Sequence, residues 1–149
     1  MPIDYDRALA LDLTAFDVLV ERGRLRAFAA AIGESDPVYV DLEAARSAGH
    51  RDLPVPPTFL FSLELEGEDP FGYLDLIGAD LRGVLHGEQS FDYRGPVHAG
   101  DTITVRPRIV EAYAKNDRMD FVVKRTDYLL EDEVVAESQS LIVIRSVAA

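Results

Sequence analysis

The second half of the chain consists almost entirely of strand-forming segments that follow one apolar, helix-forming segment. Thr102 to Tyr113 alternates apolar and polar residues, a period of two that is typical of a β-strand. Met119 to Leu130 and Val134 to Arg145 are two further strand segments joined by a tight E-D-E turn, and Val84 to Arg94 is mostly extended. Thr58 to Leu63 is apolar on nearly every side, which is typical of a buried helix. These features predict a curved antiparallel sheet wrapped around one helix.

The first half of the chain predicts shorter elements. Phe16 to Val20 is a strand candidate, and the segment from Glu21 to Gly33 has one apolar face at helical spacing. A second short helix is predicted after Asp41, a good N-cap residue, and is expected to end at Gly49. An extended proline-rich stretch follows, and Pro57 suits the first position of the buried helix.

Length and composition limit the classes of function. The 149 residues fit one domain, residues 1–149. The chain has no cysteine, so disulfides, cysteine nucleophiles and thiolate metal sites are excluded. A formal net charge of −12 argues against nucleic-acid binding. The three histidines are scattered without metal-ligand spacing, so no metal is expected. The N-terminus does not resemble a secretory signal, and no apolar stretch approaches the length of a membrane span, so a cytoplasmic protein without membrane contact is expected.

One segment resembles the active-site segment of the MaoC-like hydratase/dehydratase family. It reads F-A-A-A-I-G-E-S-D-P-V-Y-V-D, from Phe28 to Asp41, whereas the family pattern is Asp-x-Asn-Pro-x-His. Pro37 matches the proline of the family, while Glu34 replaces the aspartate, Asp36 the asparagine and Tyr39 the histidine.

A second segment supports the same resemblance. H-G-E-Q-S-F-D-Y-R-G-P-V-H-A-G-D-T-I-T-V, which begins at His86, looks like the strand, proline turn and Gly-Asp-Thr strand start of the family. The order of elements agrees over most of the chain and is most similar to N-terminal-type domains, such as the subunits of mycobacterial hydroxyacyl-thioester dehydratases. The resemblance implies an α+β hot-dog fold and fatty-acid chemistry without a cofactor. The substrate would be an acyl-CoA or an acyl-carrier thioester, hydrated or dehydrated at its 2,3-bond.

The substitutions in the first segment alter the chemistry that the family uses. Hydration needs one group that moves the Cα proton and another that handles water. Glu34 can supply a carboxylate, but the phenol of Tyr39, with a pKa near 10, is a poor base and is better suited to donate a hydrogen bond. Asp36 is a turn residue before proline, with a contact to substrate as its alternative role.

Pro57 falls where the family usually has a glycine whose N–H points at the thioester oxygen. Proline has no N–H, so this donor is expected to be missing or supplied by Thr58 or Phe59.

His86 and Glu88 are a second candidate acid–base pair. Residues at i and i+2 of a strand face the same side, so the two side chains are expected to lie together, with His86 near its working pKa. Arg51 and Arg94 are candidate contacts for the arm of coenzyme A or of a carrier protein.

Three hypotheses remain open at this point. The chain is an active hydratase/dehydratase that uses Glu34, Tyr39 or the His86–Glu88 pair, or it is a non-catalytic subunit that shapes an acyl tunnel. The third is a hot-dog thioesterase or acyl-binding protein, in which Glu64 would direct water. An exposed sheet edge predicts a homodimer or a heterodimer with a second hot-dog chain.

Overall fold

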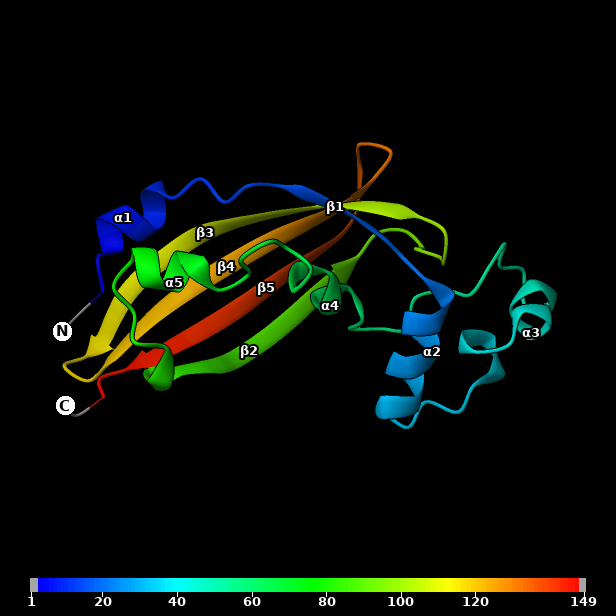
Figure 1. The fold of residues 1–149 in the computed structure, drawn as a ribbon, viewed down its shortest axis with the longest axis horizontal. Helices are drawn as coiled ribbons and strands as arrows, with labels where there is room; N and C mark the ends of the chain where they lie inside the picture. Colours follow the sequence, from blue (N-terminus) through cyan, green and yellow to red (C-terminus); the bar gives the residue numbers. More distant parts are fainter. Residues whose placement is uncertain (1–2, 148–149) are drawn as a thin grey trace.

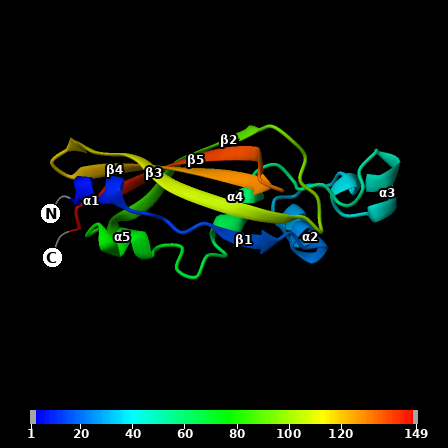
Figure 2. The same ribbon diagram turned by 90° about the horizontal axis from the view of Figure 1, so that it is seen from above.

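The computed structural model describes residues 3–147, and its centre is a five-stranded antiparallel sheet with strand order β1-β3-β4-β5-β2. The sheet curves, and α4 and α5 lie on one side of it (Figures 1 and 2). This confirms the predicted α+β hot-dog architecture. The strands are β1 (Phe16–Leu19), β2 (Val84–Tyr93), β3 (Thr102–Asn116), β4 (Met119–Leu130) and β5 (Glu133–Arg145).

The tight turn between β4 and β5 is confirmed. Glu131 and Asp132 both have positive φ angles, 49° and 67°. Positive φ at both central residues is what a two-residue hairpin of the right twist requires. The turn places Leu130 opposite Glu133, and a register shift between Leu129 and Tyr128 then places Tyr128 opposite Ala136.

The helices are short and lie in two groups. α4 (Leu60–Glu64) and α5 (Gly72–Leu76) lie on the sheet, whereas α2 (Arg22–Ala31) and α3 (Leu42–Ser47) lie beyond its end (Figure 1). The remaining helical elements are α1 (Tyr5–Ala10) and two 3-10 turns, η1 (Pro37–Tyr39) and η2 (Leu81–Gly83). Among residues 3–147, no helix is long and apolar enough to cross a membrane.

α1 was not predicted, because it is held by a contact with a distant strand. The Tyr5 hydroxyl donates to Asp120 Oδ1 at 2.5 Å, and the Ile3 N–H donates to Asp120 Oδ2 at 3.2 Å. The hydrogen bond to the carboxylate raises the pKa of Tyr5 to about 12.

The predicted start of the buried helix was wrong. α4 begins at Leu60, because Thr58 adopts a left-handed conformation with φ of 74° that interrupts the helix after Pro57. Left-handed backbone is uncommon in a residue other than glycine, and here the Thr58 N–H is fixed by a contact with β2. Leu60, Leu63 and Glu64 are the buried residues of α4.

Two apolar clusters surround α4. One joins Leu60 and Leu63 to α2, the proline-rich segment and the middle of the sheet. The other joins α1 and α5 to the far end of β3, β4 and β5. Because each cluster packs a different group of helices on the sheet, surface hollows remain on both sides of α4.

Candidate functional site

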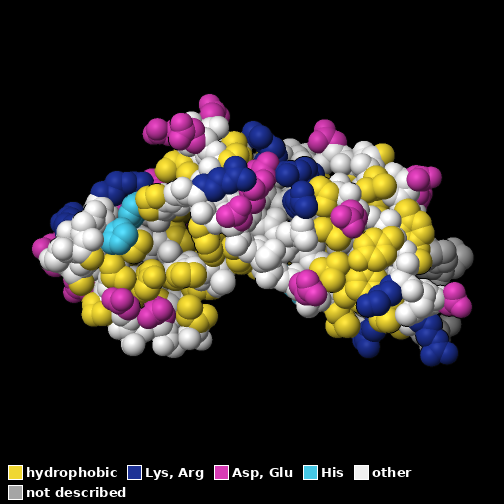
Figure 3. All heavy atoms as spheres, turned by 180° about the vertical axis from the view of Figure 1, so that it is seen from behind, with side chains coloured by type: hydrophobic (Ala, Val, Ile, Leu, Met, Phe, Trp, Pro, Cys, Tyr) yellow, Lys and Arg dark blue, Asp and Glu magenta, His cyan; other side chains and the backbone are white. Residues whose placement is uncertain are grey.

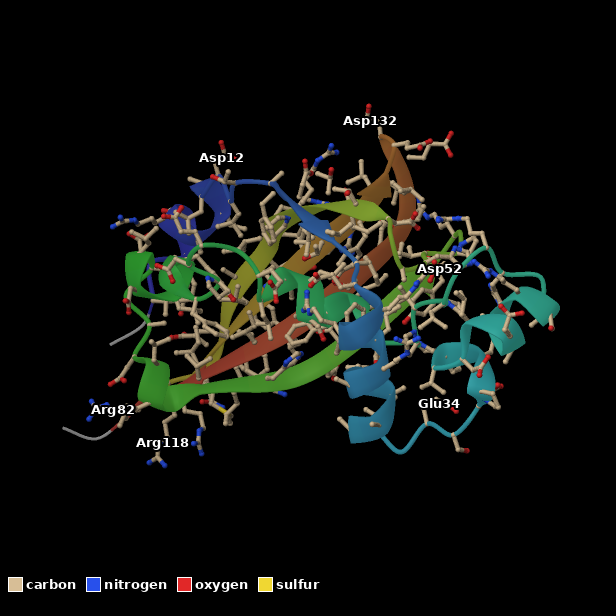
Figure 4. All side chains as sticks on the ribbon, turned by 45° about the vertical axis from the view of Figure 1, so that its right-hand side comes forward. Asp12, Glu34, Asp52, Arg82, Arg118 and Asp132 are labelled. Atoms are coloured by element: carbon tan, nitrogen blue, oxygen red, sulfur yellow. The ribbon has the colours of Figure 1, made fainter. Side chains whose placement is uncertain are left out.

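The motif residues form a short turn after α2. Asp36 is the N-cap of η1, and its Oδ1 accepts from the Val38 N–H at 3.0 Å. Glu34 Oε1 accepts from the Asp36 N–H at 2.9 Å. Figure 4 shows Glu34 on the loop that follows α2, at the end of the molecule far from α5. Both carboxylates therefore stabilise this turn.

A hollow of about 270 Å³ lies beside this turn, and we call it the motif hollow. Figure 3 shows a notch between the α3 end and the rest of the molecule, with hydrophobic side chains on its walls. Glu34 and Asp36 are not among the residues that line the motif hollow, whereas Tyr39 and Pro57 are. Its lining includes Val38, Tyr39, His50, Pro57, Leu60 and Tyr93.

Tyr39 is half-buried in the wall of the motif hollow. Burial raises the pKa of its phenol, and the charges of Glu34 and Asp36 raise it further. A raised pKa keeps the phenol protonated at neutral pH, so Tyr39 is a hydrogen-bond donor and not a base.

The backbone amides of the two residues after Pro57 are both engaged within the chain. Pro57 has no N–H. The Thr58 N–H donates to the Tyr93 hydroxyl at 2.8 Å, and the Phe59 N–H donates to the Pro56 carbonyl at 3.2 Å. Both replacements that the sequence suggested for the missing oxyanion donor are therefore engaged. Phe59 is buried against Phe28, with ring centroids 5.3 Å apart.

A histidine pair adjoins the motif hollow, and sequence reasoning missed it. His50 Nδ1 lies 3.0 Å from His98 Nε2. His98 is 6% exposed, and its pKa is lowered by burial and by the nearby charges of Arg51 and His50. Its Nδ1 is buried without a hydrogen-bond partner among the described residues, so its proton is assigned to Nε2. His98 then donates to His50, whose own proton lies on Nε2. The two rings are far apart in sequence, and no local pattern signals the contact.

The expectation that His86 and Glu88 share a face was wrong. A bulge at Gly87 shifts the register, so His86 lies opposite Ile142 and Glu88 opposite Leu141. Leu141 and Ile142 are adjacent in β5 and face opposite sides of the sheet. Their partners Glu88 and His86 therefore also face opposite sides. His86 Nε2 instead lies 2.9 Å from Gln89 Oε1, and the ring packs beside Phe61.

The two candidate arginines are both paired within the chain. Arg51 forms an ion pair with Asp101, and Arg94 forms one with Glu137. Their side chains remain half-exposed. Each guanidinium keeps further N–H donors, so a role in contacting a thioester arm stays a prediction.

A buried polar cluster lies at the other end of α4. Glu64 is 6% exposed, and Tyr128 and Ser138 both donate to its Oε1, at 2.5 and 3.0 Å. Lys124 Nζ lies 2.8 Å from Glu64 Oε2. The sequence feature that could have indicated this cluster is Glu64, a glutamate in an otherwise apolar helix. The carboxylate that a thioesterase would need to direct water is thus engaged by hydrogen bonds at Oε1 and by the ion pair with Lys124 at Oε2.

Comparison with known proteins identifies the family of this chain. A family model described as "FAS1-like, dehydratase domain region" matches residues 8–138, which is most of the chain. The chain belongs to this family. The "UPF0336 protein" of Streptomyces griseus is 44% identical over 103 residues, covering 68% of this chain and 69% of that protein. That of Parafrankia sp. is 37% identical over 134 residues, covering 87% and 85%.

Several of the similar solved structures are described as MaoC-like dehydratases. The HadBC (3R-hydroxyacyl-ACP dehydratase) complex of Mycobacterium tuberculosis matches with a TM-score of 0.69 and 26% identity, covering 85% of this chain and 90% of that one. The ChsH1–ChsH2 complex of the same organism gives a TM-score of 0.74 at 22% identity, covering 91% and 85%. The family resemblance drawn from the Phe28–Asp41 segment is thereby confirmed.

Proposed function

We propose that this chain is the acyl-binding subunit of a heteromeric dehydratase acting on 3-hydroxyacyl thioesters, in which a second hot-dog chain supplies the acid–base residues. The motif hollow carries the proposal. It is lined largely by apolar residues, as acyl-binding sites are. Tyr39 stands where the family has histidine, and the amides beside Pro57 are engaged. The hollow therefore suits binding better than proton transfer or oxyanion stabilisation.

The similarity to HadBC supports the heteromeric arrangement, because that dehydratase is a complex of two different chains. The sheet of this chain also has a long free edge at β2, where most residues are exposed. Such an edge is usually covered by a partner. A second hot-dog chain is the partner of matching geometry.

The test is to assay the chain alone and co-expressed with the product of the neighbouring open reading frame. Hydration of crotonyl-CoA and longer enoyl-CoA is followed by loss of the conjugated-thioester absorbance. We expect turnover only from the complex. In the complex, Glu34→Gln and Tyr39→Phe should each change kcat by less than about 3-fold, whereas loss of an acid–base group costs roughly 100-fold or more. A stable homodimer with full activity would refute the proposal.

The second candidate is a hydratase that is active without a partner. It is favoured by the His50–His98 pair, because His98 orients His50 at the wall of the motif hollow. His50 would carry the proton transfer, because Glu34 does not line the motif hollow. Turnover by the chain alone that is lost in His50→Gln and kept in Glu34→Gln would establish this candidate in place of the first.

A further inference from the structure

An ion pair lies inside the molecule at the point where α4 ends over the sheet. The side chains of Glu64 and Lys124 are 3% and 11% exposed, and their charged atoms are 2.8 Å apart. Lys124 Nζ also lies 5.5 Å from the centroid of the Tyr73 ring. Removing two charges from water costs several kcal/mol per ion, so the fold alone gains little from this pair.

The ion pair is part of a polar track across the face of the sheet that α4 covers. Lys124 and Thr126 alternate along β4 and share one face. Their partners on β5 are Ser140 and Ser138. Ser140 Oγ donates in turn to Gln89 Oε1 of β2 at 2.6 Å. Polar side chains thus replace the apolar ones expected on an inward face.

Three atoms of this track are buried without a hydrogen-bond partner in the described part of the chain, Glu64 Oε2, Thr126 Oγ1 and Gln89 Nε2. Thr126 is fully buried. The Lys124 ammonium faces Glu64 Oε2 as an ion pair and carries three N–H donors. Buried donors without acceptors are costly and rare in native proteins. The track therefore has donors available to an acceptor atom from outside the chain.

Two hollows meet at the ion pair. The inner hollow, of about 80 Å³, has walls that include Phe61, Leu74 and Ile142. The outer hollow, of about 490 Å³, lies in the usual size range of small-molecule sites. Glu64, Tyr73 and Lys124 line both hollows, so the ion pair stands between them with apolar walls on the inner side.

α4 contributes residues to the walls of both the motif hollow and the inner hollow. Leu60 lines the first, and Phe61 and Glu64 line the second. With a rise of 1.5 Å per residue, Leu60 and Glu64 are about 6 Å apart along the helix axis. An acyl chain that enters at the motif hollow and follows α4 reaches the ion pair within its own length.

We propose that Glu64 and Lys124 select acyl thioesters whose distal chain carries a hydroxyl or carbonyl oxygen. The site rests on the proposed function, because the acyl group must enter at the motif hollow. An alkyl chain pressed against Lys124 desolvates a charge without replacing a hydrogen bond, whereas an oxygen accepts from the ammonium. A carboxylate is disfavoured, because Glu64 and the outer-hollow residues Glu68 and Asp69 repel it.

The experiment is calorimetric titration of the full chain with two series of thioesters. One is hexanoyl-, octanoyl- and decanoyl-CoA, and the other is the same three chains with a terminal hydroxyl. We expect the hydroxylated ligand to bind about 10-fold more tightly at the length that reaches Lys124. Equal affinities at all three lengths would overturn the proposal while leaving the proposed function intact. No binding by either series would overturn both.

Variants distinguish a loss of ligand recognition at this site from a general loss of folding. The double variant Glu64→Gln with Lys124→Met removes both charges and keeps an acceptor for Tyr128 and Ser138. The preference for the hydroxylated chain should fall to less than about 2-fold in it. The matched control is Glu43→Gln with Arg46→Met, an exposed pair on α3, which should retain the preference. A preference kept by the double variant refutes the site.

Discussion

At the residue scale, the contact between Glu64 and Lys124 could not be predicted from the sequence. Each residue alone is an ordinary charged residue in an apolar segment, and only the packing of α4 on β4 brings them to 2.8 Å. His50 and His98 are a second case, since two loops bring their rings together. Asp36 is the opposite case. Its capping role is local, and the sequence D-P suffices to predict a turn.

Breaking the buried ion pair on one side should destabilise the chain more than removing it altogether. Lys124→Met leaves the Glu64 carboxylate buried without its counter-ion, and we expect a loss of about 3–5 kcal/mol. The double variant with Glu64→Gln should unfold within about 1–2 kcal/mol of the native chain, because no unpaired charge remains. Urea unfolding followed by circular dichroism measures both. A double variant as unstable as Lys124→Met would contradict the explanation.

His98 should make the stability of the chain depend on pH near neutrality. Burial lowers its pKa in the folded state, so the unfolded chain binds the proton more readily. The contribution is present above the unfolded pKa of about 6.5 and is lost as pH falls through the folded pKa. Between about pH 7 and pH 5, the native chain should lose more stability than His98→Gln.

Urea midpoints across this range measure the difference, and His86→Gln is the control, because His86 is exposed. The charges of Asp101 and Asp52 raise the pKa of His98, but burial and the charges of Arg51 and His50 lower it by more. The hydrogen bond from Arg22 lowers the pKa of Asp52 to about 2, well below this range. Equal slopes for the native chain and His98→Gln would show that His98 does not carry the effect.

At the scale of elements, the sequence predicts the strands well and the irregularities poorly. β3, β4 and β5 follow from alternation, which depends only on neighbouring residues. The late start of α4 depends on the bond from the Thr58 N–H to Tyr93, far away in sequence. The bulge in β2 depends on how Gly87 fits against β5. Motif residues were therefore found by pattern, whereas the faces on which they lie needed the structure.

Gly87 in β2 should not tolerate a side chain. A Cβ at this position would meet Val143 Cγ2 at 2.9 Å and the Leu141 carbonyl oxygen at 3.1 Å. Gly87→Ala should cost about 1–3 kcal/mol of stability through overpacking. Gly23→Ala, in α2, is the matched control. A Cβ there meets nothing within 4 Å, and the change should stabilise the chain by about 0.5–1 kcal/mol. Equal effects of the two substitutions in urea unfolding would refute this account of the bulge.

At the scale of the whole molecule, the charge of −12 acts on every anionic ligand. The two arginines nearest the expected path of a thioester arm, Arg51 and Arg94, are each partly neutralised by an acidic partner. The isolated chain therefore attracts the phosphates of coenzyme A weakly and repels them at long range. In the heteromer proposed above, the basic contacts would come from the second chain.

Added salt should consequently strengthen the binding of an acyl-CoA to the isolated chain. Raising the ionic strength from about 0.01 M to about 0.15 M shortens the screening length from about 30 Å to about 8 Å. The repulsion is then reduced, and the affinity for decanoyl-CoA should rise by at least about 2-fold. Decanoyl-N-acetylcysteamine, which carries no phosphate, controls for the effect of salt on apolar contacts. An affinity for decanoyl-CoA that falls with salt, relative to this control, would mean that Arg51 and Arg94 attract the phosphates despite their partners. The isolated chain would then hold the thioester arm without help from a second subunit.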